Sequence, residues 1–285
     1  MILCREIARA DLGAVADFLT RGFPARSRSY WMDGLRRQSE RQVPDGLPRF
    51  GYMLDHEGAP VGVLLLICTA SNGGEASIRC NISSWYVEPA FRSYAPMLTK
   101  IAQRHEHVTY FNISPAHWTW RTIESQGFRI YCGGVFFSFP ALSRPKSGLR
   151  IEVVGEDTQA MAGLPEADAA LLARHATYGC LSLVCRAADG RGFPFVLQPM
   201  RIRGIPLLAM RMIYCRDVAD YVACAGVIGR FLLWRGRISV ALDANGRVKD
   251  LAGFYREPRG RKYFKGPQRP RLADLSDTEL VIYGP

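Results

Sequence analysis

The segment from Asn81 to Met97 reads Asn-Ile-Ser-Ser-Trp-Tyr-Val-Glu-Pro-Ala-Phe-Arg-Ser-Tyr-Ala-Pro-Met, and the fold expected for the chain follows from it. Residues 82–87 are rich in β-branched and aromatic side chains and end at a Glu-Pro pair, which predicts a buried strand. A short turn with Arg92 follows, and apolar residues then recur at helical spacing from Met97. Pro96 suits the first turn of a helix, where proline forfeits no hydrogen bond. We therefore predict a strand, a tight turn and a helix.

This predicted corner is suited to an anion. A tight turn between a strand and a helix directs free backbone amides and the positive end of the helix dipole toward one point. Arg92 adds a cationic donor in the turn. We interpret the corner as a pyrophosphate site; the alternative is an ordinary strand–loop–helix corner with a solvated arginine.

The same residues resemble a family motif. Trp85-Tyr86-Val87-Glu88-Pro89 followed by Phe91-Arg92 is similar to the acyl-CoA-binding motif of the GCN5-related N-acetyltransferases, in which V-x-P-x-[FY]-[RQ] leads into x-x-G-x-[GA]. In that family the loop amides hold the CoA pyrophosphate. The resemblance implies acetyl-CoA or another acyl-CoA as co-substrate, bound by Trp85, Tyr86, Val87, Arg92, Ser93, Tyr94, Ala95, Pro96, Met97 and Asn112.

Two positions depart from the family pattern. Counted from Arg92, the glycine positions are occupied by Ala95 and Met97. Alanine differs from glycine here mainly because its Cβ disfavours positive φ values. Methionine places a side chain where the family's backbone approaches the phosphate.

The composition is that of a globular protein. The 285 residues are 48% hydrophobic and 22% charged, and no apolar run approaches the roughly 18 residues of a membrane span. Charged residues near the N-terminus argue against a signal peptide. Eight cysteines and five histidines show neither a CxxC pair nor zinc-like spacing, so we expect no metal. We expect the cysteines to act as small hydrophobes in a reducing cytoplasm.

The formal net charge of +11 favours an anionic ligand or partner. The densest basic run extends from Arg256 to Arg271 and contains one acidic residue, Glu257. It is compatible with a nucleic-acid patch, but we favour a solvated loop.

The first half of the chain has the element order β-α-α-β-β-β-α-β-α-β. The predicted strands cover residues 1–7, 51–54, 61–68, 82–87, 108–113 and 129–139, and the predicted helices cover residues 12–21, 29–41, 96–104 and 114–126. Gly127 before Phe128 predicts a C-cap for the last helix. This order is also the fold order of the acetyltransferase family, so order and motif agree without sharing residues.

The second half repeats this order with little residue identity. Residues 141–150 have the composition of a linker, so we predict domains at 1–140 and 151–285. Strands are predicted at 151–154, 181–186, 193–201, 205–215, 238–242 and 280–283, with helices from Asp157 to 176, at 218–234 and from about 248. The prediction is a mixed α/β (α+β) protein of two tandem acetyltransferase-like domains, each a twisted mixed sheet flanked by helices.

The second copy lacks the predicted anion site. After its strand at 205–215 come Asp217 and Asp220, which stabilise a helix start but repel phosphate. We expect this copy to pack on the first and to shape the acceptor cleft.

The resemblance implies acyl transfer to an amine or hydroxyl acceptor, either a small molecule or a peptide. Such chemistry needs donors for the thioester oxygen, a base and an acid. Many family members place an acidic tyrosine four residues before the Gly-Phe glycine, where this chain has Ile123. His117 and Ser114 are candidate acids, Glu88 is a candidate base, and Asn81 and Ser83 are expected to face the cleft. A non-catalytic acyl-CoA-binding protein is the alternative.

Overall fold

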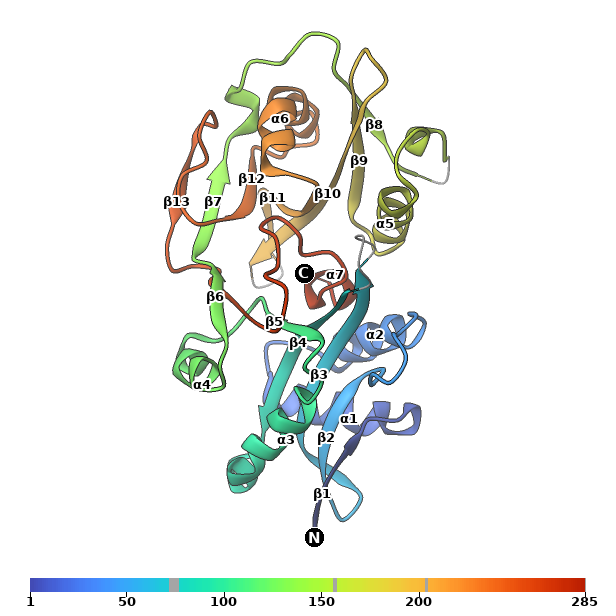
Figure 1. Ribbon diagram of the computed structural model, residues 1–285, viewed down its shortest axis with the longest axis vertical. Helices are drawn as coiled ribbons and strands as arrows, with labels where there is room; N and C mark the ends of the chain where they lie inside the picture. Colours follow the sequence, from blue (N-terminus) through green and yellow to red (C-terminus); the bar gives the residue numbers. More distant parts are fainter. Residues whose placement is uncertain (72–76, 156–157, 203–204, 285) are drawn as a thin grey trace. The chain divides into compact units, whose positions relative to one another are not determined.

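The computed structural model describes residues 1–71, 77–155, 158–202 and 205–284 (Figure 1). Within them the chain forms two compact units, each built from segments far apart in sequence. Unit 1 comprises Met1–Arg129, Tyr263–Arg269 and Asp277–Gly284; unit 2 comprises Ile130–Lys262 and Pro270–Ser276. The division into domains at 1–140 and 151–285, joined by a linker at 141–150, stays a prediction.

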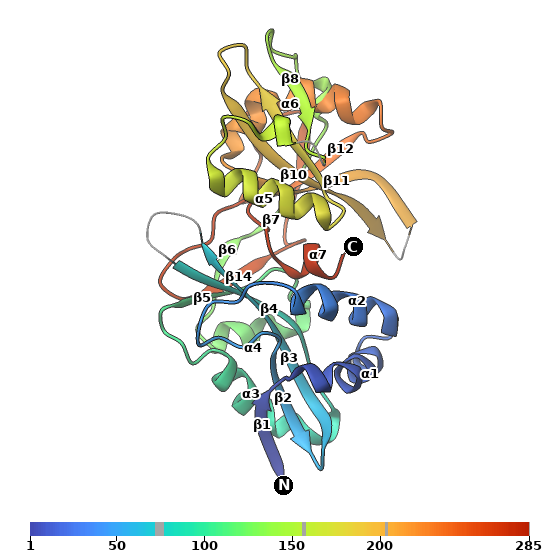
Figure 2. The same ribbon diagram turned by 90° about the vertical axis from the view of Figure 1, so that its right-hand side faces the viewer.

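Unit 1 follows the predicted element order. Its elements are β1 (Ile2–Glu6), α1 (Leu12–Gly22), α2 (Arg28–Ser39), β2 (Gly51–His56), β3 (Ala59–Ser71), β4 (Ser77–Val87), α3 (Ala95–Ala102), β5 (Val108–Asn112) and α4 (Trp120–Ser125). Strand β6 (Arg129–Cys132), which belongs to the same sheet, begins at the unit's boundary residue Arg129. Helices α1 and α2 lie over one face of the sheet and α3 over the other (Figure 2). Gly127 has φ +87°, and the Phe128 amide bonds to the Ile123 carbonyl, which confirms the predicted C-cap.

Unit 2 repeats the pattern with one long helix before its hairpin. Its elements are β7 (Gly134–Ser138), β8 (Arg150–Val153), α5 (Glu166–Thr177), β9 (Leu181–Arg186), β10 (Gly192–Ile202), β11 (Ile205–Cys215), α6 (Val218–Leu233), β12 (Ser239–Ala244) and β13 (Gly253–Arg256). Strands β11 and β12 are parallel, and α6 connects them. The predicted helix start at Asp157 lies outside the described residues.

Each sheet takes one strand from the opposite half of the sequence. The first sheet has the order β1-β2-β3-β4-β5-β14-β6, and the second β13-β7-β12-β11-β10-β9-β8. Strand β14 (Lys262–Lys265) follows β13 in the chain but pairs with β5. Strand β7 follows β6 in the chain but pairs with β12 and β13. The two mixed α/β sheets confirm the predicted fold class, while the exchange of strands does not follow from the local sequence.

Three element predictions were wrong. The single strand at 129–139 is two strands, β6 and β7, which are interrupted at Gly133 and belong to different sheets. The strand at 280–283 is a helix, α7 (Glu279–Ile282), in unit 1. The residues from 248 form a turn that leads into β13, so Gly253 opens a strand and does not close a helix.

The basic run is also not a solvated loop. Lys262 is buried and its ammonium donates to Asp243 at 2.7 Å, while Lys265 donates to Gln103 at 3.1 Å. Residues 262–265 form strand β14 of the first sheet, so Lys262 and Lys265 belong to a strand and not to a loop.

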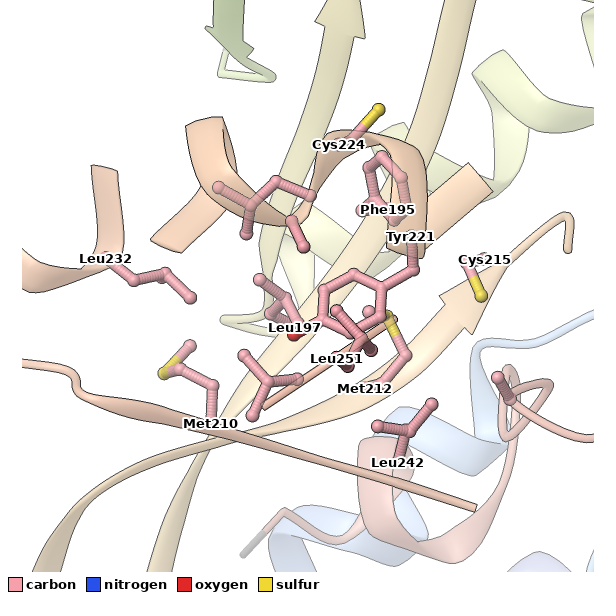
Figure 3. Close-up of a cluster of buried hydrophobic side chains, with 14 of the residues drawn as sticks. Phe195, Leu197, Met210, Met212, Cys215, Tyr221, Cys224, Leu232, Leu242 and Leu251 are labelled. Carbon is pink, nitrogen blue, oxygen red and sulfur yellow. The ribbon is translucent and has the colours of Figure 1, made fainter. Parts of the chain in front are cut away.

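The core of unit 2 shows how its sheet packs against helix α6 (Figure 3). Phe195, Met212 and Leu242 come from three neighbouring strands and meet Tyr221 of α6. The Tyr221 hydroxyl, although fully buried, lies 2.7 Å from the Ser138 hydroxyl, so that its polar atom is satisfied.

One cysteine pair departs from the expected hydrophobic role. Cys68 and Cys80 oppose each other on β3 and β4 and form a disulfide, with Cα atoms 4.1 Å apart. Cys132, Cys180, Cys185, Cys215 and Cys224 are free and buried, as expected for small hydrophobes. No helix within the described ranges is long and apolar enough to cross a bilayer.

Candidate active site

The site is built where two parallel strands of unit 1 separate. Strand β4 pairs with β5 from Ile78 to Asn81, opposite Val108 to Phe111. β5 ends one residue later, whereas β4 continues to Val87 alongside β3. Among the described residues, no strand pairs with the β5 side of β4 beyond Asn81. This edge therefore offers backbone donors and acceptors to a ligand.

A bulge reshapes β4 within the separated part. The register with β3 shifts between Val63 and Leu65, and Ser84 has φ +50°, a left-handed value that is uncommon for serine. The hydroxyls of Ser83 and Ser84 lie 2.9 Å apart. After the bulge, Trp85 packs on the side of α3, and Tyr86 packs against Phe18 and Phe23 beside α1.

The turn after β4 differs from the tight corner that we predicted. Residues Pro89–Tyr94 form a 3₁₀ helix that runs directly into α3. The Phe91 amide bonds to the Glu88 carbonyl and the Ala95 amide to the Arg92 carbonyl, so these two amides are already used. Ala95 has φ −56°, and alanine therefore costs nothing at that glycine position.

The side chains of this corner remain available to an anion. Arg92, Ser93 and Tyr94 are all exposed at the start of α3. Pro96 occupies the first turn, as predicted. Met97 is half-buried and packs into the core beneath α3, so its side chain does not stand over the corner. The arginine and the hydroxyls, more than the amides, are suited to hold phosphate here.

A segment from the far end of the sequence completes the site. The backbone amide of Glu279 donates to the Asn81 side chain at 2.8 Å, and the Asn81 amide donates in turn to the Phe111 carbonyl at 3.3 Å. Asn81 is fully buried at the last paired position of β4 and β5. The first residue of α7 is thus fixed at the point where the two strands separate.

The Glu279 carboxyl then meets the hydroxyls beyond that point. Ser114, just after β5, donates to it, and Ser83 of β4 forms a second hydrogen bond with it. Glu279 as a residue is partly exposed, but its carboxyl is buried, and the neighbouring Ser114 is exposed.

Opposing effects act on this carboxyl. Burial raises the pKa of Glu279 above its ordinary value, whereas the hydrogen bonds from Ser114 and Ser83 and the charge of Arg26 act to lower it; burial dominates. Tyr30 of α2 and Tyr283, the residue after α7, also interact electrostatically with the carboxyl. The result is a glutamate with an increased affinity for a proton beside the separated strands.

Contacts around helix α2 hold the C-terminal segment in place. Arg41 and Asp277 form an ion pair at 2.8 Å with side chains only 7% and 5% exposed. Arg37 donates to the Ile282 carbonyl at 3.1 Å, and Tyr283 donates to Gln38 at 2.7 Å. The Tyr283 ring covers Gly34, where a Cβ would overlap it.

The other predicted catalytic residues are placed less favourably. His117 is exposed, and its ring lies 4.9 Å from that of Trp118, which is 75% exposed. Glu88 is half-buried and pairs with Arg21 at 3.4 Å. Asn112 accepts a hydrogen bond from the Ser114 amide at 3.2 Å. Of the predicted catalytic residues, Ser114 is the one that contacts Glu279.

The acid position of the family carries no proton donor here. Ile123 is 4% exposed and belongs to the apolar core of unit 1. Glu279 is the site residue that sequence reasoning does not find. The only signal for it is the presence of charged Asp277 and Glu279 next to an apolar run, and that run predicts a strand of the second domain.

The equivalent position in unit 2 is occupied by protein groups. Asp217 caps α6 by accepting the Ala219 amide at 2.9 Å, and Arg216 donates to Asp168 at 2.8 Å. Within the described ranges, no group of three or more histidine, cysteine or acidic residues could hold a metal ion.

Comparison with known proteins supports the fold. No family model matches the chain, and no curated protein matches it. The solved structures to which it is similar include several GCN5-related N-acetyltransferases. That from Sphaerobacter thermophilus is 13% identical, covers 96% of this chain and 98% of its own, and gives a TM-score of 0.53.

Two further structures agree. That from Anabaena variabilis is 14% identical over 97% of this chain and 74% of its own, with a TM-score of 0.59. That from Kribbella flavida is 10% identical over 93% and 70%, with a TM-score of 0.58. Together with the element order of unit 1 and its repetition in unit 2, these similarities show that the chain has the GCN5-related N-acetyltransferase fold in tandem form.

Proposed function

We propose that this protein transfers an acetyl or other acyl group from acyl-CoA to an amine, or to a hydroxyl, and that unit 1 holds the acyl donor. The observation that carries the proposal is the separation of β4 from β5 beyond Asn81, beside the carboxyl of Glu279. An extended acyl-pantetheine chain can use the free edge of β4 as a further strand would.

The Trp85 side chain supports a ligand along this edge. Its indole Nε1 is buried and has no hydrogen-bond partner among the described residues. A buried donor without a partner is costly, and a carbonyl of the pantetheine chain would satisfy it. Together with Arg92, Ser93 and Tyr94 at the pyrophosphate end, the residues fit an acyl-CoA ligand.

The residues of this chain would then promote the reaction by positioning the two substrates and by stabilising charge with backbone amides. Free amides of β4 beyond Asn81 would stabilise the negative charge that develops on the thioester oxygen. Binding both substrates at the separated strands would hold the acceptor close to the thioester carbon. The acceptor is proposed to be a small molecule or a peptide, and a cytoplasmic location remains our prediction.

A non-catalytic acyl-CoA-binding protein is the second candidate, because Ile123 removes the family's acid. Release of free thiol from acetyl-CoA in the presence of a panel of amines and alcohols separates the two. Turnover that depends on an acceptor supports the transferase. Saturable binding of acetyl-CoA without any thiol release supports the binding protein.

A further inference from the structure

The C-terminal segment brings a carboxyl to the separated strands. Glu88, the acidic side chain at the end of β4, is already paired with Arg21. The Glu279 carboxyl instead accepts hydrogen bonds from the hydroxyls of Ser114 and Ser83. Its position depends on the contacts with α2 and with Asn81, described above, that fix α7.

We infer that Glu279, delivered by the C-terminal segment, is the base that takes the proton from the acceptor amine. This inference rests on the proposed acyl transfer and assigns a residue to one of its steps. The site would accept a protonated primary amine, because a carboxylate attracts an ammonium group and can then remove its proton.

Two protons leave the acceptor nitrogen in the proposed reaction. The acceptor ammonium gives one proton to the Glu279 carboxylate, and the freed lone pair attacks the thioester carbon. A carbon–nitrogen bond forms, the carbon–sulfur bond breaks, and the nitrogen loses a second proton. One of the two protons neutralises the departing thiolate and the other passes to solvent. The products are an amide and free CoA thiol.

The hydrogen bonds from Ser83 and Ser114 affect the pKa of the proposed base. Each stabilises the charged carboxylate, against the effect of burial that raises the pKa of Glu279. Glu279 must be ionised to act as a base, so kcat/KM should rise with pH through its pKa and then level off. Removing either donor should move this rise to higher pH. Arg26, Tyr30 and Tyr283 interact electrostatically with the same carboxyl and would remain unchanged.

The first experiment compares Glu279→Gln with Glu40→Gln, which removes an exposed carboxylate of the same unit. Thiol release with an accepted amine, acetyl-CoA affinity and urea unfolding are measured for each. General-base help is typically worth about 10²–10⁴ in rate, so Glu279→Gln should lose at least about 100-fold in turnover while acetyl-CoA affinity is kept. Glu40→Gln should match the wild type.

The second experiment does not require the Glu279→Gln variant to fold. The pH profile of kcat/KM is recorded for wild type, Ser83→Ala and Ser114→Ala. An acid limb that moves to higher pH in either serine variant supports Glu279, because a limb set by the acceptor amine would stay fixed. A limb that stays in place in both, or full turnover by Glu279→Gln, overturns the inference and leaves acyl transfer standing. Absence of turnover in the wild type overturns both.

Discussion

Tyr283 and Gln38 lie 245 residues apart in sequence, and the Tyr283 hydroxyl donates to the Gln38 side chain at 2.7 Å. The Gln38 amide donates to the carbonyls of Arg49 and Leu66, so one side chain joins α2, the first sheet and the end of the chain. Burial raises the pKa of Tyr283, which keeps this hydroxyl protonated as a donor. The C-terminal segment is therefore a structural part of unit 1.

Gly34→Ala tests the contact between α2 and the Tyr283 ring. A Cβ at Gly34 would overlap the Tyr283 ring, and forced overpacking typically costs about 1–3 kcal/mol. We expect a lower free energy of unfolding in urea. We also expect reduced turnover, because a displacement of Tyr283 would displace Glu279 with it.

Gly13→Ala is the matched control. Gly13 also lies in a helix, and a Cβ there would meet only the Arg28 guanidinium at 3.8 Å. Alanine is favoured over glycine in a helix by up to about 1 kcal/mol, so this variant should be slightly more stable and fully active. Equal behaviour of the two variants would contradict the role of the Gly34–Tyr283 contact.

Arg92→Ala should weaken the binding of acetyl-CoA. A charge-assisted hydrogen bond is worth about 1.5–3 kcal/mol, which corresponds to a roughly ten- to hundred-fold rise in Kd. Lys100→Ala, which removes an exposed cation of the following helix α3, and Arg216→Ala, at the equivalent position of unit 2, are the control variants. Calorimetry should show a single site and near-normal affinity for both control variants. Two equal sites, or unchanged affinity of Arg92→Ala, would refute the assignment.

Asp243→Ala should strongly destabilise unit 2. Asp243 and Lys262 pair at 2.7 Å with side chains 6% and 5% exposed, so removal of the acid leaves a buried ammonium. Such a change typically costs about 3–5 kcal/mol. Arg191→Ala breaks an exposed pair with Asp189 and should cost at most about 1 kcal/mol. Urea unfolding checks both, and a small effect of Asp243→Ala would show that Lys262 finds water or another partner.

The local architecture of unit 1 could be predicted because it depends on local patterns. The Glu-Pro end of β4, Pro96 at the start of α3 and the C-cap at Gly127 each follow from the conformational limits of one or two residues. The element order needs only hydrophobic periodicity. From these features alone, Ser114 and Ser83 are expected at the border of the cleft.

The rest depends on contacts between distant parts of the chain. Nothing local in Gly134 or Lys262 shows that β7 and β14 join sheets other than those of their sequence neighbours. Leu280 to Tyr283 fits a strand or a short helix equally well, because four apolar residues do not define a period. Glu279 could not be found for the same reason, since only the contacts of α7 with α2 and Asn81 place it in unit 1.

A crystal structure of the protein with acetyl-CoA tests the central claim most directly. We predict one bound molecule, with its pyrophosphate beside Arg92 and its pantetheine chain along β4 beyond Asn81, with a carbonyl within hydrogen-bond distance of the Trp85 indole. The thioester should then lie near Ser83, Ser114 and Glu279. Density for acetyl-CoA at the start of α6, or at any place other than the separated edge of β4, would contradict the account.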